Sequence, residues 1–142
     1  MNAENVIYLL SCLRNHPKTV TVVLPKEKEE DAWLRQIVQT IPHLHHVRLK
    51  EQSRYFWEFV FGQKRKFDEG NKKNHQEHRK TFLITGFEHT ALFPLLRDMN
   101  QRSRRFAELE SSVILLLHRK TYRYFSRHAP DVWFNVNLYI SE

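Results

Sequence analysis

The segment 111–118, SSVILLLH, constrains the fold more than any other part of the sequence. Its run of apolar residues leaves no polar face, which is typical of a strand in a parallel sheet covered by helices on both sides. Two further runs rich in β-branched residues, 19–24 (TVTVVL) and 81–86 (TFLITG), also predict buried strands. A chain of 142 residues is long enough to bury one core of this kind, so we expect a single domain over residues 1–142.

Segments with apolar residues at helical spacing separate these strands. The predicted helices are 2–13, 31–41, 53–62, 91–107 and 121–130, with a strand as the alternative for 53–62, and the other predicted strands are 45–50 and 133–140. Alternating strands and helices predict an α/β fold, namely a three-layer sandwich around a mainly parallel five-stranded sheet.

The positive charge of the chain is unevenly distributed. The formal net charge is +7, and the stretch 63–80 contributes +4 of it. Phe67 is the only large apolar residue in this stretch, so we expect 63–80 to be an exposed basic loop that stays outside the core. Such a loop is either a solvated insertion or a contact for nucleic acid or for an acidic partner.

Several kinds of site are excluded by composition. Cys12 is the only cysteine, which rules out an internal disulfide and a cysteine-based zinc site, and the nine histidines follow no metal-ligand spacing. The sequence has no apolar run near the roughly 20 residues that cross a bilayer, and its first residues lack the basic region of a signal peptide. We therefore expect a cytoplasmic protein without a metal and without membrane contact.

Three motifs in the second half of the chain resemble a known family. They are GFE (86–88) after an apolar strand, MNQRS (99–103) in a helix, and APDVW (129–133) after another strand and helix. Over residues 81–140 the chain resembles the nucleotide-binding domain of bacterial STAND-type P-loop NTPases. The resemblance implies a P-loop NTPase-like fold and a place in a bacterial defence or signalling assembly.

The sequence departs from that family where phosphate would bind. A P-loop needs two glycines five residues apart, followed by Lys and Ser or Thr, and none of the three glycines provides this spacing. The segment 25–31, PKEKEED, has a net charge of −2, and its acids at the predicted helix start disfavour a phosphate there. Strand 81–86 offers Thr85 where an Asp would hold magnesium. We therefore expect an inactive member of the fold, with no catalytic residues and no nucleotide cofactor.

Two groups of residues are candidate sites. Glu88, His118 and Arg119 directly follow predicted strands, where open α/β sheets bind ligands, although Glu88 capping a helix and a solvated Arg119 are the alternative. The candidate contacts to nucleic acid or an acidic partner are Lys64, Arg65, Lys66, Lys72, Lys73, Arg102, Arg104 and Arg105. A solvated basic face is the alternative for this second group.

The leading prediction is a non-catalytic adaptor that binds a protein partner in a defence or signalling assembly. The alternative is a nucleic-acid-binding protein that uses the basic stretch 63–80 and the arginine-rich helix, with nearby aromatic side chains such as Tyr122 and Tyr124 stacking on bases.

Overall fold

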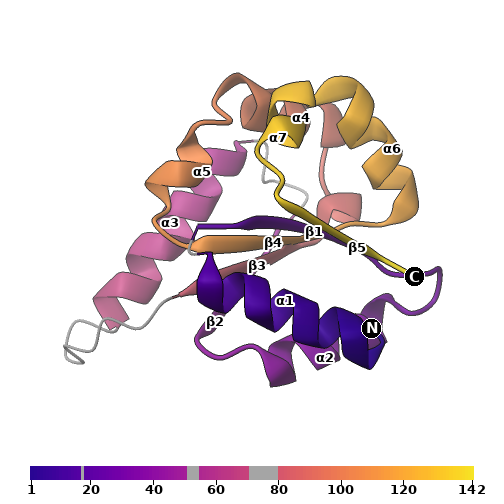
Figure 1. The fold of residues 1–142 in the computed structure, drawn as a ribbon. Helices are drawn as coiled ribbons and strands as arrows, with labels where there is room; N and C mark the ends of the chain where they lie inside the picture. The colour runs from indigo at the N-terminus through magenta and orange to yellow at the C-terminus, as the bar shows by residue number, and fades with distance from the viewer. Residues whose placement is uncertain (17, 51–54, 71–79) are drawn as a thin grey trace.

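The computed structural model describes residues 1–16, 18–50, 55–70 and 80–142, and in this part of the chain five strands form one parallel sheet (Figure 1). The strands are β1 (Val20–Leu24), β2 (Leu44–Arg48), β3 (Thr81–Thr85), β4 (Ser112–Leu116) and β5 (Leu138–Ser141). Their order across the sheet is β2-β3-β4-β1-β5, and every neighbouring pair is parallel. The three inner strands bury all of their residues, which explains why their sequences lack a polar face. The predicted α/β fold is confirmed.

Helices cover both faces of the sheet (Figure 1). One face carries α1 (Ala3–Asn15) and α2 (Glu30–Thr40). The other carries α3 (Phe56–Gly70), α4 (Leu92–Gln101), α5 (Arg105–Glu108), α6 (Arg119–His128) and α7 (Pro130–Phe134), and the short 3-10 helix η1 (Phe87–His89) follows β3. We refer to these two sets as the α1/α2 layer and the α3–α7 layer.

Each layer encloses its own core. Under the α1/α2 layer, Leu9, Trp33 and Ile37 pack on alternate residues of the strands. Under the α3–α7 layer the core is rich in aromatic rings: Phe56 and Trp57 lie edge to face at 4.8 Å between ring centroids, and Phe106 contacts both of them. Rings in edge-to-face geometry add to the stabilisation that burial provides.

The basic stretch 63–80 is helical over its first part, which corrects the predicted loop. Helix α3 continues to Gly70 because Phe67 packs on the ring of His45, with 4.5 Å between centroids, and because Lys64 forms an ion pair with Asp68 one turn later. Asp68 also forms an ion pair with Lys80. The rest of the predicted loop, 71–79, lies outside the described residues.

Two predicted elements are divided in the structure. The predicted helix 91–107 ends at Gln101, and a tight turn then brings Phe106 of α5 against Phe56 and Trp57 in the core. The predicted strand 133–140 begins only at Leu138, because α7 occupies its first residues. Pro130 starts α7 at the position where a missing N–H costs nothing.

Candidate functional site

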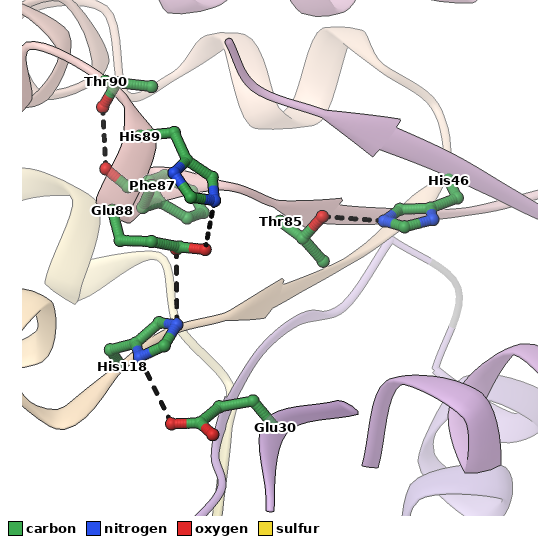
Figure 2. A network of polar contacts seen from close by, with 8 residues as sticks. All are labelled: Glu30, His46, Thr85, Phe87, Glu88, His89, Thr90 and His118. Carbon is green, nitrogen blue, oxygen red and sulfur yellow. Dashed lines mark hydrogen bonds and ion pairs between the residues drawn. The ribbon is translucent and has the colours of Figure 1, made fainter. Parts of the chain in front are cut away.

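Side chains from the segments that follow three adjacent strands, β1, β3 and β4, meet at the carboxyl edge of the sheet (Figure 2). His118, which follows β4, lies between two carboxylates: its Nδ1 is 3.2 Å from Oε1 of Glu30, and its Nε2 is 3.5 Å from Oε2 of Glu88. Glu30 begins α2 after β1, and Glu88 lies in η1 after β3. The other Glu88 oxygen is 3.2 Å from Nε2 of His89. We call Glu30, Glu88 and His118 the edge triad.

Gly86 sets the direction in which Glu88 leaves the sheet. It has a φ of +89°, and a Cβ at this position would lie 2.5 Å from the carbonyl oxygen of Leu49. Only glycine combines this conformation with so close an approach of two backbones. Phe87 then inserts its ring into the core, and the Thr90 hydroxyl donates to the Phe87 carbonyl at 2.8 Å, which closes the turn that carries Glu88.

The structure brings two of the three predicted pocket residues together. Glu88 contacts His118 and does not cap a helix by its side chain, whereas the Arg119 guanidinium donates to the backbone carbonyl of Glu142 at 3.0 Å. Glu30 completes the edge triad although the sequence marked it only as one of several acids at a helix start. The pairing of β1 with β4 places the segments after these strands side by side, and no local sequence signal reports that pairing.

The segment between β1 and α2 does not fit a phosphate. It has no glycine, and the backbone N–H of Glu29 donates to the carbonyl of Lys26 at 3.0 Å within a tight turn. That N–H is therefore occupied, although a P-loop binds phosphate through free backbone N–H groups. Glu30 also places a carboxylate at the start of α2, where it would repel an anion.

The end of β3 does not fit a magnesium ion either. The Thr85 hydroxyl is 2.7 Å from Nε2 of His46, and Arg48 Nε donates to Nδ1 of the same ring at 3.5 Å. A ring nitrogen that accepts carries no proton, so the proton of neutral His46 lies on Nε2 and is donated to Thr85. Burial, followed by the nearby charges of Arg48 and His45, lowers the pKa of His46 and favours this neutral form. Within the described ranges, no cluster of three or more His, Cys, Asp or Glu side chains could hold a metal ion.

The basic residues predicted as contacts differ in exposure and in whether they form ion pairs. Lys64 is paired with Asp68, and Arg105 stacks on the Phe61 ring at 4.3 Å while its Nε donates to Glu108 at 3.1 Å. Although partial burial of Asp68 raises its pKa, hydrogen bonds from Lys80 and Lys64 hold that pKa below its ordinary value. Four predicted contacts are exposed and form no ion pair with any residue that the structure describes: Arg65, Lys66, Arg102 and Arg104. Lys72 and Lys73 lie outside the described residues.

A second concave surface lies on the α3–α7 layer and was not predicted from the sequence. It is a groove of about 970 Å³, and residues lining it include Tyr55, Phe93, Arg97 and His128. Phe93 was missed because it was read only as part of a helix. The sequence did contain a signal for its exposure. Phe93 lies one residue outside the helical spacing of the buried residues of α4, which are Leu95, Leu96 and Met99.

The order of the strands and the helices on both sides of the sheet define an α/β protein of P-loop NTPase-like fold. The chain superposes over 98% of its length on a chain in the structure of Drosophila ORC bound to DNA, with a TM-score of 0.57 and 10% sequence identity. It spans 29% of that chain, and at this identity the likeness concerns the fold alone. No protein-family model and no curated protein sequence matches the chain. Membership of the STAND family therefore stays a prediction.

No helix in the described part of the chain combines the length and apolar character needed to span a membrane.

Proposed function

We propose that this protein is a non-catalytic module that keeps a P-loop NTPase-like fold and acts by binding a partner on its surface. The edge triad is the observation that supports this proposal most directly. Where a nucleotide's phosphates would approach the strand ends, two carboxylates instead hold His118 between them at 3.2 and 3.5 Å. This arrangement is a network of polar contacts that links two helical layers, and it places two carboxylates where an anion would have to approach.

The partner we propose first is a protein in a defence or signalling assembly. The resemblance of residues 81–140 to STAND-type domains supports this choice. The α1/α2 layer supplies a surface of suitable chemistry, since it exposes 67% of Ile7 and 47% of Val38. Two hollows of about 650 and 530 Å³ meet there at Ile41 and His43. Exposed apolar side chains beside such hollows are the chemistry that we expect of a protein contact.

The absence of nucleotide binding is tested by thermal unfolding in the presence of magnesium and ATP, ADP or GTP at millimolar concentration. A ligand that binds only the folded state raises stability by RT ln(1 + [L]/Kd), so we expect an unchanged Tm. Glu30→Ala removes one carboxylate from the phosphate approach, and we expect no gain of binding in this variant. A saturable rise in the Tm of the wild-type protein would refute the proposal.

The protein partner is tested by quantitative affinity capture from the cell of origin. We expect Val38→Asp to lose the captured partner because the substitution places a charge on the apolar surface of the α1/α2 layer. Phe134→Asp is the matched control, because Phe134 is 89% exposed on the opposite layer and acquires the same charge. Equal capture by wild type and Val38→Asp would remove the α1/α2 layer from the proposal.

Nucleic acid is the second candidate partner. Cations exposed on the α3–α7 layer support it, and the structural neighbour is an ORC structure bound to DNA. Contacts with phosphates make binding fall steeply with salt, because they release condensed counterions. We expect a mobility shift with micromolar protein at low salt that weakens at moderate salt. No shift at low salt would reject this candidate.

A further inference from the structure

The groove on the α3–α7 layer combines exposed rings with cations that form no ion pair among the residues that the structure describes. Phe93 is 56% exposed and Tyr124 is 43% exposed, although both lie on helices whose apolar faces are fully buried. The Phe93 ring lies edge to face with Tyr124 at 5.6 Å and with His128 at 5.0 Å between centroids. These three rings contact one another, and two of them, Phe93 and His128, line the groove; we call the three rings the ring cluster.

Cations surround the ring cluster. Helix α6 has no acidic residue, and its exposed side chains recur at intervals of three and four residues, which places them in one stripe along the helix. The stripe consists of Lys120, Arg123, Tyr124, Arg127 and His128. Arg97 lies on the wall of the same groove.

Asp98, which lines the groove, and the nearby Asp131 both form hydrogen bonds within the protein. One Asp98 carboxylate oxygen accepts a hydrogen bond from the backbone N–H of Trp57 at 3.1 Å, at the start of α3. Asp131 exchanges hydrogen bonds with the Asn100 side chain, with its own N–H donating at 2.7 Å. Arg97, Arg123 and Arg127 consequently form no ion pair with any residue in the described ranges, and this surface is complementary to an anionic partner.

A second hollow continues the groove. Asn100 and Gln101 line both, and the second hollow adds Arg102, Arg104 and the exposed ring of Phe134. Rings and arginines therefore both line a surface that follows the length of α4, about 15 Å for a helix of this size.

We infer that this groove binds single-stranded nucleic acid, with bases stacked on the ring cluster and phosphates in contact with Arg97, Arg123 and Arg127. Stacking on exposed rings requires bases whose faces are accessible, as they are in a single strand and not within a duplex. The inference rests on the second proposed function and names its site and its ligand. An acidic protein segment is complementary to the arginines but supplies no aromatic bases for the rings to stack on.

The test measures fluorescence anisotropy of a labelled oligothymidylate of about 12 nucleotides, within the usual range of site sizes. We expect Phe93→Ala to weaken binding about tenfold because it removes a stacking platform. Phe93→Leu should weaken it similarly, whereas Phe93→Trp should retain it, since only tryptophan keeps an aromatic face. Tyr8→Ala is the matched control: Tyr8 is 55% exposed on the α1/α2 layer, and its loss should leave binding unchanged.

The phosphate contacts are tested by the dependence of affinity on salt. Each of Arg123→Gln and Arg127→Gln should lower the slope of log K against log salt by about 0.7, because each variant neutralises one phosphate fewer of a single strand. Arg35→Gln on α2 is the matched control and should leave the slope unchanged. Circular dichroism of each variant confirms that the substitutions have not unfolded the protein.

The outcomes separate this inference from the function on which it rests. If nucleic acid binds but Phe93→Ala and the arginine variants bind as wild type does, the site is wrong while the second function stands. The single-strand assignment is overturned if a duplex of the same length binds more tightly than the single strand. It is also overturned if a polyglutamate peptide binds more tightly than the single strand and Phe93→Ala abolishes that binding. If no nucleic acid binds at low salt, both the inference and the second function fail, and the protein-binding proposal is unaffected.

Discussion

The two helical layers bury their apolar faces in similar ways but present different surfaces to solvent. Helices α1 and α2 carry almost balanced charge, and their outer side leaves apolar side chains such as Ile7 and Val38 exposed. Helix α6 in the opposite layer carries four cations among its Lys and Arg residues and no acid, and it lies beside the exposed Phe93 ring. One sheet therefore supports two surfaces of different chemistry, and we propose a protein partner for the first and nucleic acid for the second.

From this difference we propose that binding chemistry lies on the outer faces of the helices and not at the strand ends. In this fold the edge triad joins the two layers, because Glu30 belongs to α2 while His118 precedes α6. The three side chains of the edge triad contact one another. The exposed cations and rings lie instead on the outer faces of the helices.

The largest expected effect separates core rings from surface rings within the α3–α7 layer. Phe56→Ala should lower the free energy of unfolding by about 3–5 kcal/mol, because Phe56 is fully buried among other rings. Phe93→Ala should change it by less than about 1 kcal/mol, as expected for a surface substitution. Urea unfolding measures both. Equal losses in the two variants would make Phe93 a structural residue and would weaken its assignment to a binding surface.

The next effect concerns the turn that carries Glu88. Gly86→Ala should destabilise the protein by about 1–3 kcal/mol, because its φ is +89° and the new Cβ would meet the Leu49 carbonyl at 2.5 Å. Gly62→Ala is the matched control within α3, where the nearest atom is 3.8 Å away, and it should stabilise by about 0.5–1 kcal/mol. Thermal unfolding compares the two variants. A neutral Gly86→Ala would show that the two backbones separate easily at this edge.

The link between the layers is tested by a double-mutant cycle on Glu30→Gln and His118→Gln. We expect a coupling of about 0.2–1 kcal/mol, since both side chains are partly exposed and water screens the ion pair. The control cycle pairs Glu30→Gln with Arg119→Gln, whose guanidinium contacts the Glu142 backbone instead, and it should be additive. Zero coupling in the first cycle would mean that the edge triad does not hold the layers together.

The smallest expected effect is the pH dependence at the β2 edge of the sheet. Because burial lowers the pKa of His46 below its ordinary value of 6.5, the unfolded chain binds a proton before the folded one does. The contribution of His46 is therefore complete above about pH 6.5 and is lost as the pH falls toward the folded pKa. His46→Asn should flatten the fall in stability below pH 6.5, as urea unfolding at pH 7.5 and pH 5.5 measures.

The pH profile of His46→Asn should not become flat, because burial also lowers the pKa of the neighbouring His45. An unchanged profile in His46→Asn would show that burial does not lower the pKa of His46 in the folded protein.

The amount that the sequence predicts differs from element to element. The strand 112–116 was predictable because burial on both faces requires an unbroken apolar run, and that requirement is visible locally. The end of α3 was not, because its continuation past Gly62 depends on Phe67 reaching His45 on another strand. The end of α7 was missed for a different reason: its last residues, Trp133 and Phe134, fall in the predicted strand 133–140, and large apolar residues fit a helix or a strand equally well over so short a run.

By itself the sequence determined the class of fold, because the spacing of apolar residues along the chain indicates helices and strands without knowledge of which residues they contact. It also determined that the segment after β1 would repel phosphate, because that follows from the charges and glycines of one short stretch. Only the tertiary structure decided which side chains meet. The pairing of β1 with β4 brought Glu30 to His118, and the packing of α4 against α6 turned separate aromatic and basic residues into one surface. Contacts between distant segments depend on topology, which local patterns constrain only through the elements that they form.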